Sequence, residues 1–137
     1  MEIVAWFLTF TACLWVLWWM LSADARKFRK FEADVRSRIA ISEQEFAANY
    51  FRCEQIPIDV AFRVRQVFGR FTGIPAEKIL PDDDFQMFVQ DNEEELMISL
   101  EQEFGLTIAD SEAIKMRATV RSVSMVMANI VRGSLPM

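Results

Sequence analysis

The stretch that decides the fold is PDDDFQMFVQDNEEELMISLEQEFG, residues 81–105. All of its charged residues are acidic, yet from residue 92 onward apolar residues recur at helical spacing. With about 100° of rotation per residue, they gather on one side of a helix: Leu96, Met97, Leu100 and Phe104. An amphipathic helix buries its apolar side against other helices. The stretch therefore predicts a helical core with an acidic surface.

The opposite side of this helix is polar, with one apolar residue among the polar ones. The polar residues are Glu94, Glu95, Glu101 and Gln102, and Ile98 lies in their midst. An apolar side chain ringed by carboxylates suits partner recognition, because burial supplies affinity and charge steers the encounter. The simpler interpretation is a single exposed apolar residue, which soluble proteins commonly carry.

The residues before this stretch predict a second amphipathic helix, over residues 58–71. Its apolar stripe is Val60, Val64, Val67, Phe68 and Phe71, and the arginines off the stripe are Arg63, Arg65 and Arg70. Gly73 ends the helix, since glycine readily adopts the left-handed conformation of helix ends.

Caps and turns define the remaining elements. Residues 42–45 and residues 91–94 both match a capping box, in which side chains satisfy free amides at a helix start. Residues 109–116 predict one or two turns, and Thr119 caps a last helix that frays near residue 133. No stretch alternates as a strand does. The sequence predicts an all-α fold with a small four-helix bundle.

The chain opens with an uncharged run. Residues 3–21 are 19 positions without a charge, which as a helix match a bilayer core of roughly 30 Å. Trp18 and Trp19 lie near its end, where an interfacial belt places aromatic residues. The alternative is a signal peptide cleaved near residues 23–25, but no basic residue precedes the run, which exceeds the usual core of about 7–15 residues. We expect a transmembrane anchor over residues 1–22.

A basic cluster follows the run: Arg26, Lys27, Arg29 and Lys30. By the positive-inside rule it predicts an N-terminus outside and a C-terminal domain in the cytoplasm. Residues 23–57 are interpreted as a basic juxtamembrane helix and linker. This helix either continues the membrane helix, lies against anionic headgroups, or packs its apolar side on the soluble domain. Residues 58–133 are expected to form the helical bundle.

The residue inventory argues against catalysis, metal binding and nucleic acid. The chain has no histidine, which removes His-based triads and ordinary His-containing zinc sites. The two cysteines, Cys13 and Cys53, make no disulfide framework. The aspartates at residues 82–84 lack the spacing and glycine of a calcium hand, so a turn is the better interpretation, with Asp84 capping it. From residue 73 onward, twelve acidic residues face five basic ones, which would repel phosphates.

The order of the predicted helices resembles an acyl carrier protein. The resemblance covers about residues 59–131, where VRQVFGRFTGIPAEKILPDDDF leads into LMISLEQEFGLTIADSEA and then TV. Its most specific part is LEQEFGLTIADSEA, residues 100–113. Acyl carrier proteins are four-helix bundles that carry thioester-bound acyl chains on a phosphopantetheine arm. The arm hangs from the serine of an Asp-Ser-Leu motif at the start of the second long helix, which is also the acidic surface that partner enzymes bind.

This sequence departs from the family at the attachment site. Counting back from LEQEF, the three motif positions fall on Val89, Gln90 and Asp91. Gln90 has no hydroxyl to accept the arm, and no serine occurs between Ser42 and Ser99. The comparison therefore predicts that phosphopantetheine is absent. The positions that contact partners in the family correspond to Glu95, Ile98, Glu101 and Gln102.

The sequence thus predicts a membrane-anchored, non-enzymatic docking or regulatory module. Its partner would be a protein with a basic surface, and family analogy points to one in lipid or envelope metabolism. The alternative is a small membrane subunit that recognises its partner through the Trp-rich span. Thr9, Thr11, Ala12 and Cys13 are small enough for another helix to approach closely.

Overall fold

The computed structural model describes residues 1–50 and 56–134, so Cys53 lies outside the described residues. The chain divides into two compact units, Met1–Asp34 and Val35–Met137. The described residues form seven α-helices and one short 3-10 helix, with no strand among them. This confirms the predicted all-α class.

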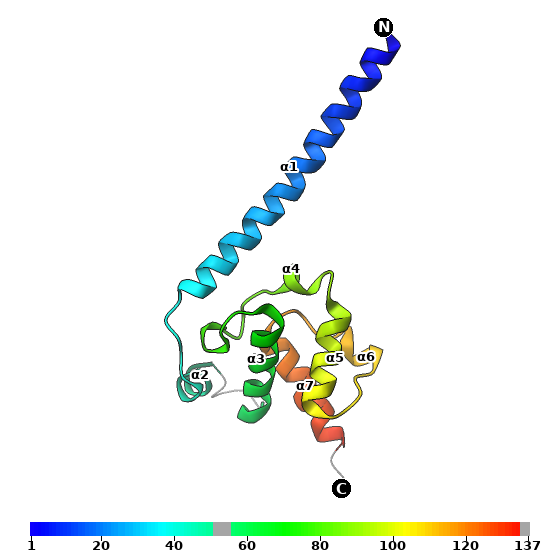
Figure 1. Cartoon of the computed structure of the whole chain (residues 1–137). Coiled ribbons are helices and arrows are strands. Elements are labelled where there is room, and N and C mark those ends of the chain that lie inside the picture. The colour runs from blue at the N-terminus through cyan, green and yellow to red at the C-terminus, as the bar shows by residue number, and fades with distance from the viewer. Residues whose placement is uncertain (51–55, 135–137) are drawn as a thin grey trace. The chain divides into compact units, whose positions relative to one another are not determined.

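The first unit consists of most of α1 (Glu2–Ser37), one continuous helix of 36 residues (Figure 1). By length and composition α1 can cross a membrane, and the apolar side chains of residues 3–21 are exposed. Hydroxyl groups within it bond back to the helix: Thr11 Oγ1 donates to the Phe7 carbonyl at 2.8 Å. This hydrogen bond satisfies the threonine hydroxyl, for which lipid tails offer no acceptor.

The basic residues after the span do not form a helix of their own. They continue α1 without a break, which is one of the arrangements that the sequence left open. The physical reason is that neither glycine nor proline occurs between residues 2 and 37, so nothing interrupts the backbone hydrogen bonds.

The second unit is a helical bundle. Its elements are α2 (Glu43–Tyr50), α3 (Ile58–Thr72), η1 (Ala76–Lys78), α4 (Gln86–Val89), α5 (Glu93–Phe104), α6 (Asp110–Ala113) and α7 (Val120–Ser134). α3 packs against both α5 and α7, and Figure 1 shows these three helices together. η1 and α4 are each only about one turn long, too short for the repeated apolar spacing that predicts the longer helices.

The apolar stripes form the core of the bundle, as the helical spacing predicts. Val60, Val64, Val67 and Phe68 of α3 are buried, as are Leu96 and Leu100 of α5 and Val120, Val123 and Met127 of α7. Phe71 is only partly buried. Phe85 fills the space beside Phe68, with ring centroids 5.3 Å apart.

Three of the predicted helix ends are confirmed and one is wrong. Gly73 takes φ 72° and its amide donates to the Gly69 carbonyl. Ser42 Oγ accepts the Glu45 amide, and Thr119 Oγ1 accepts the Ser122 amide. The capping box at residues 91–94 does not form, because α5 begins at Glu93 and its N-cap is Asn92 rather than Asp91; Asn92 makes no side-chain cap hydrogen bond. Its Nδ2 donates instead to the Phe88 carbonyl at 3.4 Å, back towards the turn of α4.

Arg65 is predicted to lie outside the apolar stripe of residues 58–71, but it is buried. It is 2% exposed and donates to three backbone carbonyls, those of Ile79 at 3.1 Å, Glu77 at 2.8 Å and Ile41 at 3.4 Å. Its guanidinium carbon lies 4.1 Å from the centroid of the Phe46 ring. Arg65 follows Ala61 by four residues and precedes Phe68 by three, so it shares their buried side.

The segment before α3 belongs to this core. Val35, at the end of α1, and Phe46, in α2, are both fully buried. Arg38 pairs with the buried carboxylate of Asp83 at 2.6 Å, and the Ile41 amide donates to the Glu77 carbonyl at 2.8 Å. These contacts hold residues 35–46 against the loop that follows α3.

Replacing Ser124 with alanine should stabilise the bundle by about 1 kcal/mol. Ser124 Oγ of α7 is buried and has no hydrogen-bond partner among the described residues. Alanine removes the unpaired hydroxyl and leaves the backbone unchanged. The measurement is the free energy of opening from hydrogen exchange of α7. Ser122→Ala is the control and should destabilise, because Ser122 Oγ accepts the Arg117 amide at 2.8 Å. Equal losses of stability in Ser124→Ala and Ser122→Ala would contradict the prediction.

Candidate functional site

The acidic helix α5 presents three glutamates in its first turn, Glu93, Glu94 and Glu95. All three side chains are exposed. Carboxylates are stabilised at a helix N-terminus by the helix dipole, so this turn holds its charge at little cost. Leu96 and Leu100 of α5 are buried in the core, which directs the glutamates outward.

A groove of about 650 Å³ runs along one flank of α5, beside α6. Its apolar residues are Met97 and Ile98 of α5, Ile108 of the loop, and Ala113 and Ile114 at the end of α6. Ile98 is 45% exposed and Ile114 is 82% exposed. We call this surface the α5–α6 groove.

The α5–α6 groove is strongly negative. Among the described residues, no lysine or arginine lines it, and five carboxylates do: Asp91, Glu93, Glu94, Glu101 and Asp110. One of them, Glu101, also stabilises the fold. Its Oε1 accepts a hydrogen bond from the Ile108 amide at 2.8 Å, which holds the loop between α5 and α6. An apolar strip between carboxylates fits a surface that is itself apolar and basic.

The predicted partner-binding residues divide between two flanks of α5. Glu94, Ile98 and Glu101 line the α5–α6 groove. Glu95 and Gln102 line a second hollow, of about 490 Å³, on the flank that faces α3. The helical periodicity placed all five residues on one exposed side of α5. It does not show that α3 and α6 pack on different flanks of that side and so separate the five residues into two surfaces.

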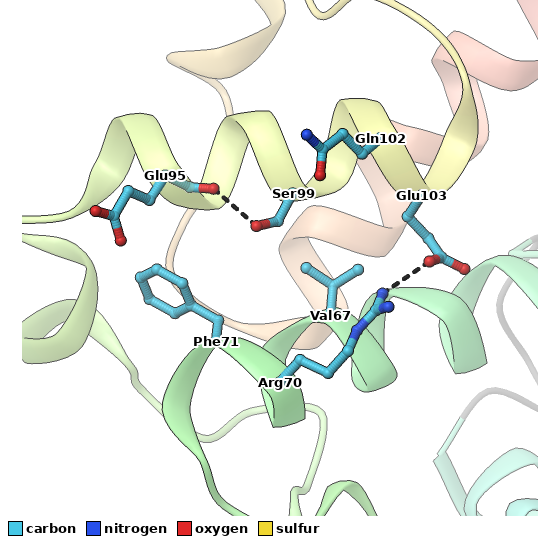
Figure 2. A pocket seen from close by; sticks show the side chains of 7 residues that line it. All are labelled: Val67, Arg70, Phe71, Glu95, Ser99, Gln102 and Glu103. Carbon is cyan, nitrogen blue, oxygen red and sulfur yellow. Dashed lines mark hydrogen bonds and ion pairs between the residues drawn. The ribbon is translucent and has the colours of Figure 1, made fainter.

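Figure 2 shows the hollow between α3 and α5 from close by. Val67, Arg70 and Phe71 of α3 line it, opposite Glu95, Ser99, Gln102 and Glu103 of α5. Ser99 Oγ donates to the Glu95 carbonyl at 2.9 Å, and Arg70 pairs with Glu103 at 2.7 Å. With one arginine against two glutamates, this flank carries much less charge than the α5–α6 groove.

Glu103 holds α3 and α5 together. Its carboxylate accepts from Arg70 at 2.7 Å and from Arg63 at 3.3 Å, and its backbone carbonyl also accepts from Arg63. The hydrogen bond from Arg70 is the main reason that the pKa of Glu103 lies below its ordinary value; burial acts in the opposite direction. The hydrogen-bonding groups of Glu103 are therefore engaged in contacts between α3 and α5.

Gln90 is the residue that the resemblance to acyl carrier proteins would align with the carrier serine. Gln90 follows α4, is exposed and lines the groove together with Asp91, whereas Val89 is buried. A carboxamide has no hydroxyl through which a phosphodiester to the arm could form. Ser99 is in the middle of α5 and bonded to its own helix.

Each of the three consecutive aspartates has its own hydrogen-bond or ion-pair partners. Asp82 pairs with Arg121 at 2.7 Å, Asp83 accepts from Arg38 and from the Leu80 amide, and Asp84 Oδ1 accepts the Gln86 amide at 2.9 Å. The turn-capping role expected for Asp84 is confirmed. Among the described residues, no group of three or more His, Cys, Asp or Glu is arranged to hold a metal ion.

Sequence reasoning missed the contribution of α6 to the site. Ile114 is 82% exposed, and Asp110 adds a carboxylate opposite those of α5. The sequence indicated a turn at residues 109–116 but not which side of α5 it covers. No protein-family model matches this chain, and no curated protein or solved structure matches it either.

Proposed function

We propose that this chain is a membrane-anchored, non-enzymatic docking or regulatory module of acyl-carrier-like design. The α5–α6 groove would receive an apolar and basic surface of a partner protein. The anchor would be α1, whose length and composition suit a bilayer. A cytoplasmic bundle and a partner from lipid or envelope metabolism remain part of this proposal, by analogy with the carrier family.

One observation carries the proposal: Ile98 and Ile114 are exposed in a groove that has five carboxylates and no cation. Burying these two side chains on a partner would supply affinity, and the uniform charge would steer a basic partner and exclude acidic ones. An exposed isoleucine is unremarkable alone. Two of them facing one acidic groove from different helices favour a recognition surface over a solvated one.

Carrier activity is not part of the proposal. Gln90 stands where a carrier has its serine, and its amide cannot take a phosphopantetheine arm. The side chains that line the groove include no nucleophile and no general base other than carboxylates, which supports a binding role rather than an enzymatic one.

A second candidate function is recognition through the membrane span. A shallow groove of about 330 Å³ lies along one side of α1, lined by Thr9, Ala12, Cys13, Val16, Leu17 and Met20. The small residues among them, Thr9, Ala12 and Cys13, allow another transmembrane helix to approach closely. Replacing the span with an unrelated membrane helix separates the two functions, because docking through the bundle would survive the exchange.

Replacing Ile98 with aspartate should reduce partner recovery at least about tenfold, because it removes apolar contact and adds a sixth carboxylate to the groove. The measurement is the amount of partner that co-purifies with the full chain in mild detergent. Ile98 is 45% exposed, so the bundle should keep its helicity.

Met125→Asp is the matched control. Met125 of α7 is 51% exposed and does not line the groove, so the same chemical change there should leave recovery unchanged. Retained binding in Ile98→Asp, or equal loss in both variants, would contradict docking through this groove.

A further inference from the structure

One face of α1 combines tryptophans with cations. At 3.6 residues per turn, six exposed side chains fall within about 120° of one another around the helix axis. They are Trp15, Trp18, Trp19, Arg26, Arg29 and Lys30. We call this surface the Trp–Arg face. Cys13 and Leu17, which line the shallow groove, lie on the other side.

The spacing along α1 would place the tryptophans and the cations at adjacent depths in a bilayer. Arg26 follows Trp19 by seven residues, a rise of roughly 10 Å. The Arg26 side chain turns back towards the span, because its Nε donates to the Ser22 carbonyl at 3.2 Å. Its guanidinium is therefore held about one turn beyond Trp19. The headgroup layer of a bilayer is roughly 5–8 Å thick, so tryptophans at its inner edge would leave this guanidinium within it.

We propose that the Trp–Arg face binds the headgroup of an anionic phospholipid. Guanidinium and ammonium groups donate charge-assisted hydrogen bonds to phosphate oxygens, and indole N–H groups donate where an apolar body meets a polar layer. Basic clusters next to a span attract anionic lipid. The inference depends on α1 crossing a bilayer and is independent of docking through the α5–α6 groove.

The nearby charges favour this face over the rest of α1. Asp24, a carboxylate at the same depth, lies about 160° around the helix from Arg26. Lys27 lies about 100° from Arg26, outside the face. Arg26 and Lys27 are both exposed and adjacent in sequence, so they differ mainly in which side of α1 they occupy. They form a matched pair for an experiment.

The test uses the full chain in nanodiscs of phosphatidylcholine containing a minority of phosphatidylglycerol. Native mass spectrometry counts the lipids of each class that stay bound after release. The wild-type chain should retain phosphatidylglycerol in preference to phosphatidylcholine, and excess inorganic phosphate should not displace it. Arg26→Gln should lower the retained phosphatidylglycerol about fivefold, whereas Lys27→Gln should lower it less than twofold.

Three results would overturn the proposal. Equal retention of both lipids by the wild-type chain would show no anionic site. Equal losses in Arg26→Gln and Lys27→Gln would show a diffuse attraction around the helix rather than a face. A chain that does not stay in the nanodisc would remove the membrane span on which the inference depends. None of these results bears on binding at the α5–α6 groove, which is measured by partner recovery.

Discussion

Replacing Arg65 with methionine should lower the free energy of unfolding of the bundle by about 3 kcal/mol. Methionine keeps an unbranched apolar stem but donates no hydrogen bond. The Ile79 and Ile41 carbonyls would then lose the donor that Arg65 provides, while the Glu77 carbonyl would keep the Ile41 amide. The Phe46 ring would also lose the guanidinium above it.

The cost of burying the charged Arg65 guanidinium limits the stability that Arg65→Met would lose. Burial lowers the pKa of Arg65 below its ordinary value, and the charges of Glu77 and Glu43 only partly oppose the shift. Methionine removes this desolvation cost. The Ile79 carbonyl would be buried without a donor, at a cost of about 1–3 kcal/mol, and the partly buried Ile41 carbonyl would add to this cost, so the loss should still dominate.

The measurement for Arg65→Met is hydrogen exchange of α3 and α7 in the full chain, in mild detergent. Arg63→Met is the control on the same helix. Arg63 is 42% exposed, pairs with Glu103 and lies over the Phe104 ring, so its loss should cost less than about 1 kcal/mol. Equal destabilisation by the two variants would contradict the role assigned to Arg65.

Replacing Phe46 with alanine should destabilise the bundle by about 3–5 kcal/mol. Phe46 is fully buried, lies under the Arg65 guanidinium and packs beside Phe62, with ring centroids 6.3 Å apart. Its removal leaves a cavity and takes away the apolar surface on which Arg65 rests. Hydrogen exchange should therefore rise in α3 as well as in α2.

Asn49→Ala is the control for Phe46→Ala. Asn49 is an exposed residue of the same short helix, so its replacement should change stability by less than about 0.5 kcal/mol. If Phe46→Ala left α3 unchanged, residues 43–50 would not be part of the core of the bundle.

The helices could be predicted from the sequence because each depends on a local pattern. The stripes of Val60, Val64 and Val67 and of Leu96 and Leu100 define their own buried sides through spacing alone. Gly73 likewise ends its helix through a local conformational preference.

The contacts that could not be predicted join residues far apart in the chain. Arg65 looked like a surface residue because its carbonyl partners lie at residues 41, 77 and 79. Asp83 looked solvated because Arg38 lies 45 residues away. The same limit applied to the candidate site, where only the placement of α6 separates Glu94 from Glu95.

The most direct test of docking through the α5–α6 groove compares Glu94→Lys with Glu95→Lys. Both residues are exposed in the first turn of α5, so the two variants change net charge and the helix dipole equally. They differ because Glu94 lines the α5–α6 groove and Glu95 lines the hollow beside α3. Partner recovery with the full chain in mild detergent should fall at least about fivefold for Glu94→Lys and less than twofold for Glu95→Lys. Equal recovery with both variants, or a larger loss with Glu95→Lys, would contradict docking through this groove.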